Sequence, residues 1–293
     1  MNFKIFVLVL SMVSWGFSNP LADLAITKIP SVLFALIVCG VGFLFLVVVA
    51  TIRRRIPVIP WKLVIPLGIM QPGLAWYFAS LGYTHENAST GVLILTSETL
   101  FTVLIGVFWL RDRLTTKQWI YFLIGIFGVI IASSASRHVE TSSTTIYFLV
   151  SALSFGVYAN VMRKYVSGYS SVDLVLGQTF VSTILFGAFY LAGGAVHPQG
   201  ISSNIWISAV LCGVFGVGLP FVAFNYAVQG VPGKIIGPSL NIIPIAGVLT
   251  SLVLGRGAPT ITQIFGSLLV IASVSLISEK PIQHKTQTQE TSI

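Results

Sequence analysis

Apolar residues in this chain occur in long runs that are separated by short polar connections. A helix that crosses a bilayer needs about 20 consecutive, mostly apolar residues. Ten segments meet this requirement and predict ten transmembrane helices. They lie near residues 3–22, 31–51, 62–83, 88–110, 117–135, 145–163, 172–193, 204–228, 234–254 and 260–278. The pattern therefore predicts an all-α integral membrane protein with no separate soluble domain.

The composition supports the same fold class. Hydrophobic residues make up 55% of the 293 residues and charged residues only 8%, whereas a soluble domain carries roughly 25% charged residues. So few charges could not cover a soluble core of this size, and a lipid bilayer removes that difficulty. The net charge of +8 does not indicate a nucleic-acid partner, because the basic residues are scattered between apolar runs.

The distribution of Lys and Arg predicts how the chain is oriented. If the N-terminus is cytoplasmic, 13 of the 16 Lys and Arg residues lie on the cytoplasmic side, and only Lys28, Arg137 and Arg256 lie outside. Such a bias is typical of cytoplasmic loops. It predicts a multi-pass membrane protein with both termini in the cytoplasm. It also supports the helix count, since a missed helix would scramble the alternation.

The chain also repeats itself at low identity. Residues 87–110 align without gaps on 232–255 at an offset of 145. The alignment pairs Leu95 with Leu240, Arg111 with Arg256 and Gln118 with Gln263, and an offset of 140 pairs residues 14–16 with 154–156. Because each repeat contains five helices, the second repeat must cross the membrane in the opposite sense. Secondary transporters use such inverted repeats to form a site near the bilayer midplane.

The predicted organisation has three parts. Residues 1–137 form the first five-helix repeat and residues 138–279 form the second, inverted repeat. Residues 280–293 are polar and rich in Thr and Gln, which is typical of a disordered cytoplasmic tail.

Three stretches contain more specific motifs. Ser14–Asn19 matches a W-G-x-x-[FN] opening in helix one. Thr96–Phe101 and Leu110–Thr115 resemble an E-P pair in helix four and an L-x-E-x-L-T segment before helix five, with one substitution in each. Leu240–Pro244, followed by Gln263 and Gly266, echoes that pattern in the second repeat. Over nearly its whole length the chain resembles the EamA-type permeases of the drug/metabolite transporter superfamily.

That resemblance implies a carrier of the plasma (inner) membrane, with a central cavity lined by helices one, three, four, six, eight and nine. The family includes exporters of amino acids and other metabolites, and also importers, so the resemblance does not specify a substrate. Thr99 stands where the E-P pair has proline, which predicts a weaker kink in helix four. Asp112 replaces the usual glutamate, and the second repeat keeps Pro244 without the acid.

Glu98 is the most informative single residue, because it is an acid near the middle of helix four. A charge at the bilayer centre costs about 2.5–3.5 kcal/mol on insertion scales. Such a group must face a cavity, pair with another group or stay protonated. Three hypotheses follow for Glu98: a proton-coupling or cation site, a polar contact for the substrate without coupling, or a neutral acid that joins two helices.

Other polar and aromatic residues lie in the middle of predicted helices. Amides buried without a partner are costly, so these residues should face protein, water or substrate, with plain helix packing as the alternative. The candidate substrate-binding residues, besides Glu98, are Trp15, Asn19, Gln71, Trp76, Tyr77, Tyr158, Asn225 and Asn241. Prolines interrupt the helical hydrogen-bond ladder, and the candidate hinges are Pro20, Pro72, Pro238 and Pro244.

Two further predictions concern the ends of helices. Tyr83 is expected to anchor helix three at the membrane interface, as tyrosines near a surface commonly do. Arg111, Asp112 and Arg113 are expected to form a cytoplasmic topology anchor with a local ion pair, or alternatively a cytoplasmic gate.

These observations predict a secondary, alternating-access carrier, an exporter of a small organic metabolite such as an amino acid or a related amphipathic solute. Coupling to protons through Glu98 is part of this hypothesis. An uncoupled facilitator or channel-like permease is the alternative, and a membrane enzyme fits less well because the acids are isolated. The expected partners are a small-molecule substrate, protons and the lipid bilayer, for a monomer or homodimer. No motif indicates a cofactor or a metal site.

Overall fold

The computed structural model describes residues 3–54, 56–134, 141–166, 168–195, 198–231 and 233–278. All of its regular structure is helical. The elements are α1 (Phe3–Ile26), α2 (Ser31–Ile52), α3 (Trp61–Gly68), η1 (Ile69–Leu74), α4 (Ala75–Tyr83), α5 (Ala88–Leu95), α6 (Ser97–Trp109), α7 (Thr116–Ser134), α8 (Thr141–Tyr165), α9 (Ser171–Ala192), α10 (Ser203–Cys212), η2 (Gly213–Gly218), α11 (Leu219–Val228), α12 (Gly233–Leu240), α13 (Ile242–Val253) and α14 (Ile261–Ser278).

Several of these elements continue one another, and together they make ten membrane-crossing units. Seven units are long and apolar enough to span a membrane by length and composition. Three shorter apolar helices complete the set: Thr116–Ala132, Ile242–Val253 and Ile261–Ile277. The predicted all-α fold with ten transmembrane segments is confirmed. The proposed boundary at residues 137 and 138, and the tail at 280–293, fall outside the described residues.

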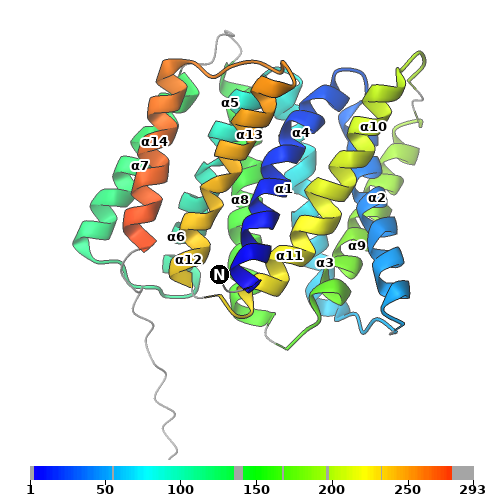
Figure 1. Ribbon diagram of the computed structural model, residues 1–293, viewed down its shortest axis with the longest axis horizontal. Helices are drawn as coiled ribbons and strands as arrows, with labels where there is room; N and C mark the ends of the chain where they lie inside the picture. Colours follow the sequence, from blue (N-terminus) through cyan, green and yellow to red (C-terminus); the bar gives the residue numbers. More distant parts are fainter. Residues whose placement is uncertain are drawn as a thin grey trace, which may run out of the picture.

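The helices form one bundle (Figure 1). α7 and α14 pack together at one edge, and α2, α9 and α10 lie at the opposite edge. α1 and α8 run through the middle of the bundle. Large apolar side chains such as Leu44, Phe108, Phe127 and Leu191 are exposed on the outside. An apolar exterior suits a protein whose surroundings are lipid.

The repeat is visible in the helix boundaries. α5 and α6 are separated at Thr96, and α12 and α13 are separated at Asn241, which is 145 residues later. The third helix of each half contains a short π-helical segment, η1 in the first half and η2 in the second. Corresponding helices therefore break at corresponding places, although few residues are identical.

Local sequence accounts for the break in the third helix. Gln71 has an extended conformation, with φ −139° and ψ 124°, and the residue before a proline favours this region. Pro72 itself has no N–H to continue the helical ladder. Pro72, one of the candidate hinges, therefore lies at a break in the third helix.

The fourth helix breaks without a proline. The hydroxyl of Thr96 donates to the carbonyl oxygen of Leu93 at 2.6 Å, and that of Thr99 donates to the carbonyl oxygen of Thr96 at 2.8 Å. Hydroxyl groups that bond back to the preceding turn compete with the ladder and bend helices. The break in the first half thus occurs beside threonine hydroxyls, and the equivalent break in the second half occurs near Pro244. Both halves have the break at the same place in their fourth helix.

The two halves interlock, because the first helix of each half packs against the fourth helix of the other. α1 packs on α13, and α8 packs on α6. The contact at Gly16 is so close that an added Cβ would lie 2.5 Å from Cβ of Ala246 and 2.6 Å from the carbonyl oxygen of Ile243. At Gly156, its repeat equivalent, an added Cβ would lie 2.8 Å from Cβ of Phe101. Small residues permit this close approach of helices.

Gly16→Ala is expected to destabilise the protein, because the new methyl group must push α1 away from α13. Overpacking of this kind costs about 1–3 kcal/mol. Gly187→Ala is the matched control, since its added Cβ would meet only Cδ1 of Leu36, at 3.9 Å. Thermal unfolding of both purified variants tests the prediction, and equal melting temperatures would show that the Gly16 contact is not tight.

Candidate functional site

A central cavity of about 70 Å³ lies between the two halves. At roughly 10–15 Å³ for each water, it has room for about five water molecules or one small organic group. Its lining comprises Trp15, Ser18, Asn19, Gln71, Ala75, Trp76, Ala79, Val92, Leu95, Thr96, Glu98, Thr99, Ser151, Phe155, Phe221, Leu240, Asn241, Ile243 and Pro244. These residues come from the first, third, fourth, sixth, eighth and ninth membrane-crossing units, which are the helices that the family resemblance implied.

The structure brings together most of the residues that the sequence singled out. The candidate residues that line the cavity are Trp15, Asn19, Gln71, Trp76, Glu98, Asn241 and Pro244. Three other candidates, Tyr77, Tyr158 and Asn225, do not line it. Tyr77 instead packs on Phe78 and Phe186 at centroid distances of 5.5 and 5.8 Å. Pro20 lies within α1 and Pro72 within η1, whereas the side chain of Pro238 lies outside the described residues.

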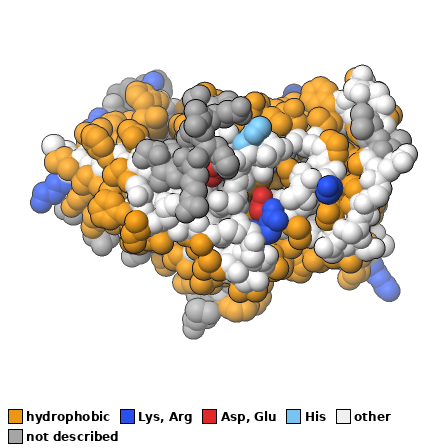
Figure 2. All heavy atoms as spheres, turned by 90° about the horizontal axis from the view of Figure 1, so that it is seen from above, with side chains coloured by type: hydrophobic (Ala, Val, Ile, Leu, Met, Phe, Trp, Pro, Cys, Tyr) orange, Lys and Arg blue, Asp and Glu red, His pale blue; other side chains and the backbone are white. Residues whose placement is uncertain are grey.

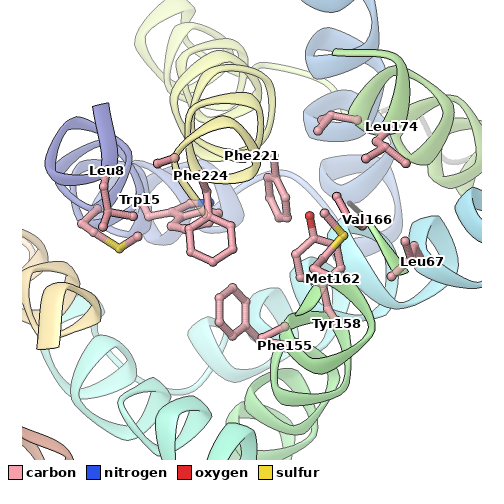
Figure 3. Packing of buried hydrophobic residues seen from close by; sticks show 14 of the residues in the cluster. Leu8, Trp15, Leu67, Phe155, Tyr158, Met162, Val166, Leu174, Phe221 and Phe224 are labelled. Atoms are coloured by element: carbon pink, nitrogen blue, oxygen red, sulfur yellow. The ribbon is translucent and has the colours of Figure 1, made fainter. Parts of the chain in front are cut away.

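Aromatic rings form much of the apolar wall, and the repeat relates them in pairs. Trp15 and Phe155 are 140 residues apart, and Trp76 and Phe221 are 145 residues apart. The ring of Trp15 meets Phe155 at 5.8 Å and Phe221 at 5.1 Å, edge to face in both cases (Figure 3). Sequence reasoning missed the roles of Phe155 and Phe221. Applying the repeat alignment to Trp15 and Trp76 would have found them.

Trp15 is held in place by η2. Its indole N–H donates to the carbonyl oxygen of Gly216 at 3.0 Å, and the hydroxyl of Ser14 donates to that of Phe215 at 2.6 Å. A π-helical segment offers such carbonyl groups because its own hydrogen-bond pattern is displaced. The break in the eighth membrane-crossing unit therefore orients an aromatic ring at the cavity.

The polar wall contains one acid and several amides. Glu98 is half-buried and is the second residue of α6. Among the described residues, no cation forms an ion pair with its carboxyl group. Asn241 donates to the hydroxyl of Ser275 in α14 at 3.1 Å, and Oε1 of Gln71 is buried without a hydrogen-bond partner. The cavity can therefore contact a solute through a carboxyl group, amides and rings.

An outer vestibule of about 480 Å³ lies next to this cavity. Tyr83 lines the vestibule, and its hydroxyl donates to Oδ1 of Asn19 at 2.9 Å. Since Asn19 lines the cavity, this hydrogen bond joins the wall of the vestibule to the wall of the cavity. The prediction that Tyr83 is an interface anchor is wrong, because only 5% of the residue is exposed. Its neighbours are protein groups, and its hydroxyl has a partner inside the bundle.

Two ion pairs join the halves at opposite ends of the bundle. Nε of Arg256 lies 2.7 Å from Oδ2 of Asp23 at the end where α1 finishes, and Nη1 of Arg163 lies 3.0 Å from Oδ2 of Asp112 at the other end. The carboxylates are only 4% and 2% exposed. Figure 2 shows acidic and basic side chains close together near the middle of the first of these ends.

The Asp112 pair corrects the sequence prediction. A local ion pair with Arg111 or Arg113 was expected, but the carboxylate of Asp112 meets Arg163 from α8. Asp23 was not singled out at all. The signal was present in the repeat, since Asp23 and Arg163 are 140 residues apart and therefore occupy equivalent positions.

A ten-helix membrane fold with two interlocked halves, matched helix breaks and a cavity between them defines a membrane transporter. The chain belongs to the EamA-like transporter family, whose model matches residues 2–134 and 142–279. The two matches correspond to the two halves of the fold. Membership in this family makes the protein a transporter and not an enzyme.

Proteins with known descriptions agree with this assignment. The chain is 24% identical over 285 residues to a protein of Salmonella typhimurium described as a probable amino-acid metabolite efflux pump, with 92% of each chain covered. It is 24% identical over 118 residues to an S-adenosylmethionine uptake transporter of Rickettsia bellii, covering 39% of this chain and 40% of that protein. A crystal structure at 17% identity has a TM-score of 0.68 and covers 94% of this chain and 96% of its own, which shows a shared fold.

Proposed function

We propose that this transporter is a secondary, alternating-access carrier of the plasma (inner) membrane that exports a small organic metabolite. The observation that carries the proposal is a cavity at the interface of two halves with cross-half contacts at both ends of the bundle. Alternating access requires such a site, which opens to one side at a time. The likeness to an efflux pump supports export.

The lining favours an amino acid or a related amphipathic solute. Trp15, Trp76 and Phe155 offer faces to an apolar side chain, and Glu98 offers a carboxylate to an ammonium group. Arg256 is engaged by Asp23, and no Lys or Arg is among the lining residues. A strongly anionic solute would therefore find no cation in the described part of this cavity.

In this mechanism the two ion pairs close the two entrances. The Asp23–Arg256 pair holds the end of α1 against the segment after α13, and the Asp112–Arg163 pair holds the end of α8 against the segment after α6. Rocking of the halves would break one pair while the other stays formed. Each pair thus acts on one side of the membrane.

Counterflow in proteoliposomes tests the proposed function. The probes are a radiolabelled mixture of the twenty L-amino acids and, in a separate experiment, radiolabelled S-adenosylmethionine. At least one probe should show saturable uptake that is accelerated when unlabelled solute is loaded inside. Ser151→Trp, which fills the cavity from α8, should abolish that uptake. Flux without saturation or counterflow would indicate a channel-like permease and contradict the proposal.

A further inference from the structure

Three polar side chains meet in the apolar core beside the central cavity. Tyr158 in α8, Gln178 in α9 and Asn225 in α11 have no exposed surface. The hydroxyl of Tyr158 donates to Oδ1 of Asn225 at 3.2 Å, and the amide group of Gln178 lies next to the same hydroxyl. Their neighbours in the hydrophobic cluster include Leu174 and Phe221. Polar groups in such surroundings need hydrogen-bond partners.

Most of the polar atoms in this group lack a partner. Oε1 and Nε2 of Gln178 and Nδ2 of Asn225 are buried and make no hydrogen bond of normal geometry, although the Gln178 amide lies close enough to the Tyr158 hydroxyl to interact with it. Leaving such atoms unpaired is unfavourable, whereas an apolar side chain of similar size would pack there without that cost. Unpaired buried atoms in a native protein point to a bound water or ligand. The site offers four amide N–H donors and one amide carbonyl, so it suits a group rich in hydrogen-bond acceptors.

Two aromatic rings separate this polar group from the central cavity. Phe155 and Phe221 line the cavity, and both also contact the ring of Tyr158, at centroid distances of 6.1 and 5.6 Å. Figure 3 shows the Tyr158 hydroxyl pointing away from α8 toward Phe221. Tyr158 and Asn225 follow Phe155 and Phe221 by about one helical turn in helices that run toward the predicted cytoplasmic end. The polar group therefore lies on the cytoplasmic side of the rings.

We propose that Tyr158, Gln178 and Asn225 form a second solute site, which binds the carboxylate or carbonyl oxygens of an amino-acid-like solute. This proposal rests on the proposed carrier function. A solute that leaves the cytoplasm reaches this site first, and movement of Phe155 and Phe221 then admits it to the central cavity. The two sites differ in chemistry, because the polar groups of the second site are all neutral, whereas the cavity also has the carboxyl group of Glu98.

Solvent access to the second site can be tested without knowing the solute. Asn225→Cys is compared with Val175→Cys, which lies equally buried in the same cluster. Cys39 and Cys212 are replaced by Ala in both variants. Methanethiosulfonate ethylsulfonate is added from the cytoplasmic side of membrane vesicles. We expect Asn225→Cys to react at least 10-fold faster than Val175→Cys. Equal, slow reaction at both positions would overturn the proposal.

Gln178→Leu tests whether the site serves transport, using a solute that shows counterflow with the unaltered protein. We expect the initial rate from the cytoplasmic side to fall at least fivefold while that solute still raises the melting temperature, because the central cavity is unchanged. A more stable variant with full counterflow would reduce the site to buried water and overturn the proposal. If no probe shows counterflow in the unaltered protein, the proposed function fails, and the labelling rates alone decide whether the second site exists.

Discussion

Glu98→Gln is expected to abolish transport driven by a proton gradient, while solute exchange at equal pH persists with weaker solute binding. Glu98 is the only acid among the residues that line the central cavity, and no cation pairs with it in the described part of the chain. A carboxyl group in such a position can gain and lose a proton as the cavity changes sides, whereas an amide of nearly the same shape cannot. Proteoliposomes with an imposed pH difference measure the first activity, and counterflow at equal pH measures the second.

Glu98→Asp is the matched control. It keeps a group that titrates and shortens the side chain by one methylene, so gradient-driven transport should persist at a lower rate. Gradient-driven accumulation that is unchanged in Glu98→Gln would exclude coupling through this residue. If the unaltered protein shows exchange and no response to the gradient, the transporter is an uncoupled facilitator, and Glu98 is then a polar contact or a neutral link between helices.

The helices could be predicted from the sequence because the bilayer imposes one simple demand, a run of about 20 apolar residues. The kink near Pro72 and the repeat followed from local chemistry and from alignment. The assembled site could not be predicted in the same way. Tyr158 and Asn225 were grouped with the cavity residues because the family resemblance implied that their helices face it, yet Phe155 and Phe221 lie between them and the cavity. Depth along a helix does not determine which side chain reaches a cavity.

The ion pairs also could not be predicted from local sequence. Asp23 and Arg256 are separated by 233 residues and meet only because α1 packs on α13. Charge counting placed Arg256 outside the membrane, and this assignment contained no information about a partner. Only the repeat alignment, when it is applied to charged positions as well as apolar ones, shows that the ends of α1 and α8 are equivalent.

Removing the cytoplasmic ion pair is expected to favour the conformation that is open to the cytoplasm, and removing the outer ion pair is expected to favour the conformation that is open to the outside. Arg163→Gln frees the cytoplasmic end, and Arg256→Gln frees the outer end. Loss of a partly exposed pair with a buried carboxylate costs about 1–2 kcal/mol, which changes a two-state ratio roughly 5- to 30-fold. Ser151→Cys in the cavity wall, in a background without other cysteines, reports the shift. Its reaction with an impermeant thiol reagent should become faster from the cytoplasm in Arg163→Gln and faster from outside in Arg256→Gln.

Lys62→Gln and Lys28→Gln are the matched controls for loss of a positive charge at the two ends. Both lysines are exposed, and neither forms an ion pair in the described part of the chain. Neither substitution should alter the labelling. A shift in the same direction for Arg163→Gln and Arg256→Gln would mean that the pairs stabilise the fold without closing separate entrances.

Exchanging both charges of one pair should restore normal behaviour, and the repeat itself supports this expectation. Asp23 at the end of α1 occupies the position that Arg163 has at the end of α8, so the acid and the base are exchanged at these two helix ends, although their partners Arg256 and Asp112 lie one position apart in the repeat. We expect the contact to depend mainly on charge complementarity, although the carboxylate of Asp23 also accepts a hydrogen bond from the backbone N–H of Ala88. Asp23→Arg combined with Arg256→Asp should return Ser151→Cys labelling to the level of the unaltered protein, whereas each single reversal should open the outer end. A double variant that stays as open as the single reversals would show that the other contact of Asp23, with the backbone of Ala88, outweighs the ion pair at this end.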